Sequence, residues 1–268
     1  MKTKQWLLAT VISATGLIVA CTKQNSTGNG SSPSGDATGT TEVQTQSNDV
    51  TQVSGELDAA TDDVNNSLNS SATFSGTASY NGGVVTDGGG GSLNLDLGIC
   101  DATVTVDTAN GLRQIIITYN GTNCRGNRTR TGTVVVSIPV GTHWRDKGAV
   151  VTVDIENLKI TRLIDNKSIT LNGTYTYTNV TGGLLKDLAT LGTITHTISA
   201  DSVSIEFADS ATRIWSVAKQ RDFTYNDGIV ETTTGTHSDG TNTDVAIWGT
   251  NRYGNSFETL ITQPLVVE

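Results

Sequence analysis

Apolar residues alternate with threonine and other polar residues over most of the chain from Thr73 onward. This period of two matches a β-strand, in which successive side chains point to opposite faces. Threonine suits the solvent-facing side of a strand because it is β-branched and polar. The pattern therefore predicts antiparallel strands with one buried and one solvated face. It is clearest in the segments at 93–97, 134–140, 169–178, 203–207 and 245–249.

The alternation breaks phase at two places. Apolar residues fall on odd numbers up to Ile155 and on even numbers from Leu158, and a similar slip occurs between Ile198 and Val203. A slip of one residue within a long strand indicates a β-bulge. We therefore predict an all-β domain over residues 73–268, a long-stranded antiparallel meander that forms a curved sheet or an open barrel.

Turn and helix signals complete this prediction. Asn-Gly at 110–111 lies between two alternating runs and predicts a tight hairpin. Further turns are expected at 81–83, 165–166 and 226–228. The insert at 183–191 has helical spacing and is expected to cap an open end of the sheet. A short N-terminal helix over residues 56–72 is predicted from the helical spacing of Leu57, Ala60, Val64 and Leu68.

The N-terminus has the features of an export signal. Lys2 and Lys4 precede an apolar, uncharged stretch at 6–20. That stretch is shorter than the roughly 20 residues that span a bilayer and has the length of a signal peptide's apolar core. It ends in Ile-Val-Ala-Cys at 18–21, which resembles the bacterial lipoprotein box. The resemblance implies that residues 1–20 are removed as a signal peptide and that Cys21 is acylated, with palmitate among its acyl chains. The alternative is an ordinary signal peptide with a chance cysteine.

Residues 21–55 consist mainly of Ser, Thr, Gly, Asn and Gln. Such a segment buries too little apolar surface to offset the entropy lost on ordering. It is therefore predicted to be a disordered tether between the acylated cysteine and the folded domain. Because stable attachment takes two acyl chains or more, the expected partner of Cys21 is the membrane itself.

The net charge and the two remaining cysteines bear on the expected partners and on an expected disulfide. The chain has a net charge of −9, which becomes more negative when Lys2 and Lys4 are removed. A field of that sign disfavours nucleic acid as a partner. The hairpin at 110–111 should bring Cys100 close to Cys124. In an exported chain this predicts a disulfide, and the alternative is two free buried thiols.

Three polar clusters are candidate sites. His143, Arg145 and Asp146 could serve a hydrolase, but flanking glycines predict a loop tip. Arg125, Arg128 and Arg130 in the loop at 124–130 could bind a carboxylate or phosphate, or pair with local acids. The loop at 235–244, which contains His237, has oxygen ligands at odd spacing. It lacks the order of a calcium loop and predicts a polar turn.

No other signal points to catalysis. His196 alternates with Ile194 and Ile198 on an expected strand. The chain lacks the G-x-S-x-G, H-E-x-x-H and G-x-x-x-x-G-K motifs. We predict no catalytic residue, no metal site and no cofactor. Three tryptophans could stack on sugars: Trp144, Trp215 and Trp248. We expect them instead in the core or at its rim.

Several segments together resemble uncharacterised exported lipoproteins of Bacteroidetes. They are the lipobox, the Ser/Thr/Gly tether, CDATVTV at 100–106, CRGNRTRTGTVVV at 124–136 and the region at 213–240 that begins RIWSV. The resemblance implies an all-β protein of the cell envelope and brings no catalytic residue. In such bacteria, the signal associated with surface display is a lipidated cysteine that is followed closely by acidic residues. Since Thr22, Lys23 and Gln24 follow Cys21, the outer membrane with the domain facing the periplasm is expected.

These features favour a lipid-anchored cell-envelope protein with a non-enzymatic binding or structural role, and with an apolar or a glycan ligand. One alternative is a carrier that holds a lipid or other apolar ligand on a concave sheet. Another is a glycan-active or hydrolytic enzyme that uses His143 or the arginine loop. An apolar cavity would favour the carrier, and a cleft in which a histidine pairs with a carboxylate would favour the enzyme. A filled core with neither feature would favour the non-enzymatic binding or structural role.

Overall fold

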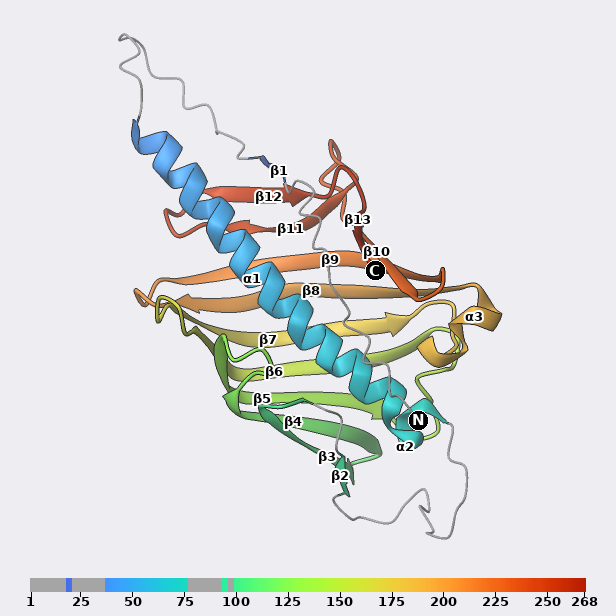
Figure 1. The fold of residues 1–268 in the computed structure, drawn as a ribbon. Helices are drawn as coiled ribbons and strands as arrows, with labels where there is room; N and C mark the ends of the chain where they lie inside the picture. The colour runs from blue at the N-terminus through green and yellow to red at the C-terminus, as the bar shows by residue number, and fades with distance from the viewer. Residues whose placement is uncertain (1–17, 21–36, 77–92, 96–98) are drawn as a thin grey trace, which may run out of the picture.

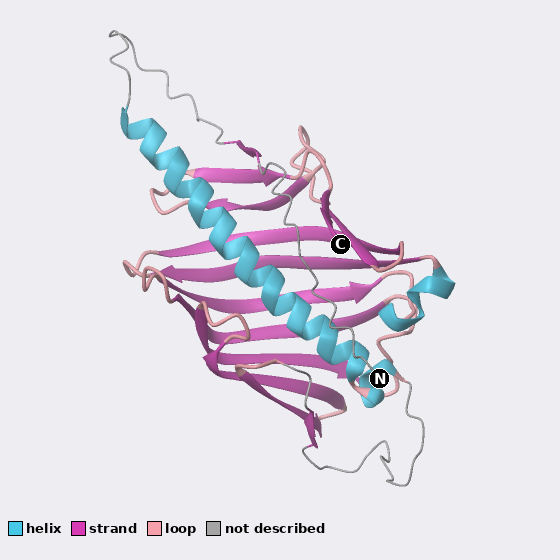
Figure 2. Cartoon of the chain, viewed as in Figure 1, coloured by secondary structure: helices cyan, strands magenta, loops and turns pink. Residues whose placement is uncertain are grey.

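The computed structural model describes residues 18–20, 37–76, 93–95 and 99–268, and its main feature is one large antiparallel sheet (Figures 1 and 2). Among the described residues the sheet has 13 strands, in the order β1-β12-β11-β9-β8-β7-β6-β5-β4-β3-β2, with β10 joined to β9 and β13 to β10. The predicted antiparallel meander is confirmed, and the sheet remains open. The strands are β1 (Ile18–Ala20), β2 (Leu93–Leu95), β3 (Ala102–Ala109), β4 (Leu112–Thr122), β5 (Arg128–Pro139), β6 (Ala149–Arg162), β7 (Ser168–Asn179), β8 (Thr193–Phe207), β9 (Thr212–Tyr225), β10 (Ile229–Gly235), β11 (Val245–Thr250), β12 (Ser256–Leu260) and β13 (Leu265–Val267).

Three of the four predicted turns are present. Asn110 and Gly111 both have positive φ and connect β3 to β4, as a two-residue hairpin turn of this kind requires. Asn166 and Asp227 also have positive φ, between β6 and β7 and between β9 and β10. The turn expected at 81–83 lies outside the described residues.

Both predicted bulges are confirmed. The pairing of β6 with β7 shifts register between Ile155 and Leu158, where Asn157 has a φ of 50°. The pairing of β8 with β9 shifts between Ala200 and Val203. At the first bulge the backbones of β5 and β6 approach closely. A Cβ on Gly132 of β5 would lie only 2.3 Å from the Asn157 carbonyl oxygen, so this position requires glycine. The extra residues allow long strands to bend while their apolar side chains stay on the buried face.

A long helix, α1 (Ala37–Ser70), crosses one face of this sheet diagonally (Figure 1). It is followed by α2 (Ala72–Ser75). The apolar side of α1 packs against the apolar face of the sheet and forms one core with it. The buried apolar residues of α1 are Val50, Val53, Leu57, Ala60, Val64 and Leu68.

The helix that we predicted over residues 56–72 is present, but α1 begins at Ala37, so the predicted tether boundary at residue 55 is wrong. Residues 37–55 are poor helix formers on propensity alone. They are helical here because Val50 and Val53 continue the spacing of Leu57 and are fully buried against the sheet. The rest of the predicted tether, residues 21–36, lies outside the described residues.

The insert at 183–191 closes one end of the sheet, as predicted. It forms a 3₁₀ turn, η1 (Leu185–Asp187), and one turn of helix, α3 (Leu188–Leu191). Two leucines of the insert, Leu184 and Leu188, are buried.

β1 is an edge strand of the sheet and pairs with β12. It belongs to the segment that we expect to be removed as a signal peptide.

Among the described residues, no helix is both long and apolar enough to cross a membrane.

Candidate functional site: a polar trough beside helix α1

The polar side of α1 is acidic and faces basic side chains of the sheet and of the β11–β12 turn. The helix contains six carboxylates and no lysine or arginine. Five of the carboxylates form ion pairs, which we call the helix clamp. The clamp consists of Asp49 with Arg252 at 2.7 Å, Glu56 with Arg128 at 2.9 Å, Asp58 with Lys219 at 2.9 Å, Asp62 with Arg221 at 2.6 Å and Asp63 with Arg130 at 2.7 Å.

Arg221 is the most buried basic residue of the clamp, since its side chain is 2% exposed. Its guanidinium lies beneath α1 and contacts Asp58, Asp62 and Glu231. Beside it, Lys219 donates to Asp58 and to the Ser54 hydroxyl at 3.0 Å. Burial alone would raise the pKa of Asp58, but Lys219 and Arg221 hold it below its usual value. The carboxylate is therefore kept charged at the interface of helix and sheet.

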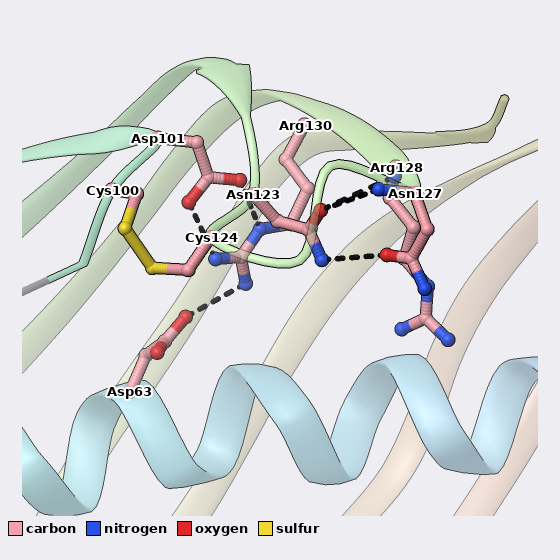
Figure 3. The surroundings of a disulfide bond; sticks show 8 residues. All are labelled: Asp63, Cys100, Asp101, Asn123, Cys124, Asn127, Arg128 and Arg130. Carbon is pink, nitrogen blue, oxygen red and sulfur yellow. Dashed lines mark hydrogen bonds and ion pairs between the residues drawn. A yellow bond between two sulfur atoms is a disulfide. The ribbon is translucent and has the colours of Figure 1, made fainter. Parts of the chain in front are cut away.

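Arg130 links α1 to the disulfide region (Figure 3). Its guanidinium donates two hydrogen bonds to Asp101, both at 2.6 Å, and a third to Asp63 of α1. The same group stacks over the Tyr119 ring at 4.3 Å. This planar group with five donors suits such a shared site better than a lysine would.

Cys100 and Cys124 form the predicted disulfide, with their Cα atoms 5.1 Å apart (Figure 3). The bridge joins the start of the β3–β4 hairpin to the loop that follows it. Of the two interpretations of the arginine loop, pairing with acids holds for Arg128 and Arg130. Arg125 is exposed and makes no ion pair with a described residue.

A polar trough runs along one flank of α1. It consists of two adjoining pockets of about 720 and 430 Å³, which share Gly55, Glu56 and Arg128. Alternate connections of an antiparallel meander lie at the same end of the sheet, so the β4–β5, β6–β7 and β8–β9 connections together form the outer wall. The larger pocket is lined by Thr45, Asn48, Asp49, Thr51, Gln52, Gly55, Glu56, Arg128, Arg162, Lys167, Ser168, Phe207, Ala208, Asp209 and Arg252. The smaller pocket is lined by Gly55, Glu56, Asp58, Ala59, Asp62, Asp63, Asn123, Cys124, Arg125, Asn127, Arg128 and Arg130.

The apolar space between α1 and the sheet is small. A cavity of about 20 Å³ lies between Leu57 and Thr61 of the helix and Tyr175 and Val217 of the sheet. That volume holds about one water molecule. An apolar ligand on this face would therefore require α1 to move away from the sheet.

His143 lies in the turn between β5 and β6, as expected for a loop tip. Its Nδ1 is 3.7 Å from an Asp146 carboxylate oxygen, which instead accepts a hydrogen bond of 2.7 Å from the His143 backbone N–H. Trp144, between them in sequence, is fully buried. The residues that line the trough do not include any of these three.

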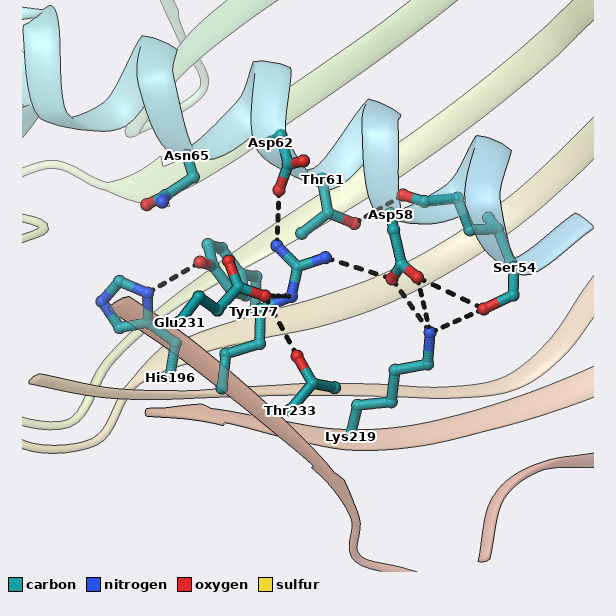
Figure 4. A network of polar contacts seen from close by, with 12 residues as sticks. Ser54, Asp58, Thr61, Asp62, Asn65, Tyr177, His196, Lys219, Glu231 and Thr233 are labelled. Atoms are coloured by element: carbon teal, nitrogen blue, oxygen red, sulfur yellow. Dashed lines mark hydrogen bonds and ion pairs between the residues drawn. The ribbon is translucent and has the colours of Figure 1, made fainter. Parts of the chain in front are cut away.

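His196 is buried on β8 in an aromatic cluster. Its Nδ1 is hydrogen-bonded to the Tyr177 hydroxyl at 2.7 Å (Figure 4). The rings of Trp144, Tyr177 and Phe223 lie within 5.1 Å of it, centroid to centroid. Its contacts are those of a core residue.

The loop at 235–244 forms the predicted polar turn. The Asp239 carboxylate accepts hydrogen bonds of 2.6 Å from the backbone N–H groups of Asn242 and Thr241, and these lower its pKa to about 2. The His237 ring stacks on Trp248 with centroids 3.8 Å apart. Trp248 is partly exposed, whereas Trp144 and Trp215 are core residues.

The trough was not predicted from the sequence, because half of its helical wall lies in the segment that we assigned to the tether. The sequence does contain a signal for a longer helix. Asp49 and Glu56 lie seven residues apart, which is about two helical turns and places them on one side. Val50 and Val53 continue the apolar spacing of Leu57.

Comparisons of this chain with protein-family models, with curated proteins and with solved structures found no match. The protein is an open antiparallel sheet with a long helix held to one face by ion pairs and a polar trough along the flank of that helix.

Proposed function

We propose that this protein is a lipid-anchored protein of the cell envelope that binds a glycan in the polar trough without catalysis. The observation that carries the proposal is the trough itself. Its two pockets are within the range of ligand sites. They follow α1 from Thr45 to Asp63, about 27 Å at 1.5 Å per residue. This length favours an extended, chain-like ligand.

The lining of the larger pocket supports a sugar ligand. Its hydroxyl and amide groups can donate and accept hydrogen bonds with the hydroxyls of a glycan. These groups belong to Thr45, Asn48, Thr51, Gln52 and Ser168. By contrast, the apolar face that a lipid carrier would use is covered by α1 and leaves room for about one water.

The anchoring part of the proposal rests on Ile-Val-Ala-Cys at 18–21 and on the signal-like segment before it. Acylation of Cys21 would hold the chain at the outer membrane, with the domain facing the periplasm. The absence of a catalytic role is supported by the placement of His143, which lies outside the trough lining and 3.7 Å from its neighbouring carboxylate.

Gly55 offers a direct test of the trough. It lies where the two pockets meet, and a Cβ added there would contact no atom within 4 Å. A Gly55→Leu side chain would therefore extend into the trough. Since leucine is the better helix former, α1 should be retained. Asn66→Leu, at an exposed position of α1 outside the trough lining, is the matched control.

Binding would be measured by calorimetry with a panel of soluble neutral and acidic oligosaccharides. We expect at least one to bind the mature chain and Gly55→Leu to weaken it by about tenfold or more, equal to about 1.4 kcal/mol. Asn66→Leu should bind like the unaltered chain. If no oligosaccharide binds, or if Gly55→Leu binds as tightly as Asn66→Leu, the trough is not a glycan site.

A further inference from the structure

Every carboxylate that lines the polar trough forms an ion pair with an arginine of the protein. Asp49 and Asp209 both contact Arg252, and Glu56 contacts Arg128. In the smaller pocket, the remaining carboxylates contact arginines of the sheet: Asp58 and Asp62 contact Arg221, and Asp63 contacts Arg130. Each trough carboxylate therefore already has a cationic partner within the protein.

Two basic residues of the trough are not neutralised in this way. Lys167, on the β6–β7 connection, lines the larger pocket, and Arg125, on the β4–β5 connection, lines the smaller one. Both side chains are exposed, and neither forms an ion pair with a described residue. Each pocket thus has one cation available to a ligand, with Gly55 at the junction between them.

A third cation strengthens the larger pocket. Arg162 forms its ion pair with Asp165, an exposed neighbour that does not line the trough. Its Nε is buried and has no hydrogen-bond partner among the described residues. An exposed pair of this kind contributes only about 0–1 kcal/mol, so a ligand anion can compete for the guanidinium at little cost.

From this distribution of charge we infer that the ligand of the trough is an acidic glycan, whose carboxylates bind Lys167 together with Arg162 in the larger pocket and Arg125 in the smaller one. The inference rests on the glycan-binding function proposed above and adds the ligand's charge. The rest of the protein carries a net negative charge. That charge disfavours long, densely charged polyanions at a distance, whereas a short chain with a carboxylate on each sugar needs only these local cations.

The probe for this inference is a short oligogalacturonate, a chain of uronic acids. The same oligomer with its carboxyls methyl-esterified is the matched neutral ligand. Calorimetry on the mature chain should show that the acid binds about tenfold or more tightly than the ester. Lys167→Met and Arg125→Met should each weaken binding of the acid by about fivefold and leave binding of the ester unchanged. Added salt should weaken binding of the acid, because exposed charges are screened.

Lys159→Met is the control variant, because Lys159 is an exposed lysine of β6 that does not line the trough. It should bind both ligands like the unaltered chain. If the ester binds as tightly as the acid and Gly55→Leu blocks both, glycan binding stands and the acidic ligand is wrong. If the acid binds but Gly55→Leu has no effect, neither proposal holds for the trough. Equal binding of a short polyglutamate would refute the preference for a glycan.

Discussion

His196 is a titratable residue in the core whose protonation makes the free energy of unfolding depend on pH. It is 1% exposed and lies among Trp144, Tyr177 and Phe223. Burial, and then the charge of Arg221, lower its pKa from 6.5 to about 3. The folded protein therefore holds this ring neutral at pH values where the unfolded chain binds a proton.

This difference predicts a loss of stability in acid. A histidine with a lowered pKa in the folded state contributes its full stability above pH 6.5 and loses it as the pH falls from 6.5 toward 3, at about 1.4 kcal/mol per pH unit. Urea unfolding between pH 7.5 and 4.5 should show a steeper decline for the unaltered chain than for His196→Phe, which cannot be protonated. The carboxylates titrate in both chains, so the difference between the slopes isolates His196. Parallel slopes would contradict the prediction.

Among the elements, α1 depends most on the rest of the molecule. Its sequence is rich in threonine, serine and asparagine, so its stability as a helix comes mainly from packing. Its apolar residues are buried in the sheet core, and the helix clamp holds its polar side to strands β5 and β9 and to the β11–β12 turn. Replacing an arginine of the clamp should therefore weaken the whole helix–sheet interface.

Arg221→Met tests this dependence. It would leave Glu231 and two carboxylates of α1 facing a buried apolar side chain. Removing one partner of a buried ion pair typically costs about 3–5 kcal/mol. We expect the lower end, because Asp58 and Asp62 are partly solvated. Arg162→Met, which removes an exposed pair with Asp165, should cost less than about 1 kcal/mol. Urea unfolding followed by circular dichroism would measure both, and equal losses would mean that the clamp contributes no more than a surface pair.

For the whole molecule, the proposed anchoring in the cell envelope depends on Cys21, which lies outside the described residues. If the lipobox is used, the mature chain begins at this cysteine and carries the mass of its acyl chains. Cys21→Ser removes the thiol to which they attach. We expect an uncleaved precursor or a chain recovered from the soluble fraction, and mass spectrometry together with detergent partitioning would show which.

The matched control for this experiment is the double variant Cys100→Ser, Cys124→Ser. It removes the other two cysteines of the chain but keeps the lipobox. Its mature N-terminus should still be acylated, even if the domain is less stable without the bridge. A mature chain of the unaltered protein that starts at another residue, without acyl mass, would rule out the anchor.

Much of the sheet was predictable because the signals are local. The two-residue period, the phase slips at 155–158 and 198–203, and Asn-Gly at 110–111 each specify geometry within one strand or one hairpin. The Cys100–Cys124 bridge follows from the same hairpin. The arginine loop could be identified as a candidate site, and the sequence left open whether it binds a ligand or pairs with acids.

The helix from Ala37 and the polar trough depended on tertiary structure. Asp49 is held by Arg252 and Asp58 by Lys219, partners far away in the sequence that only the folded sheet brings to α1. Weak local propensity in residues 37–55 was overridden by burial of Val50 and Val53. Gly55, Lys167 and Arg125 lie far apart in the sequence, so their place in the lining of one trough could not be recognised either. Local patterns thus specify the strands, because the side-chain period is set within each segment. The helix and the trough required the assembled sheet, because both depend on charges and apolar surface contributed by distant strands.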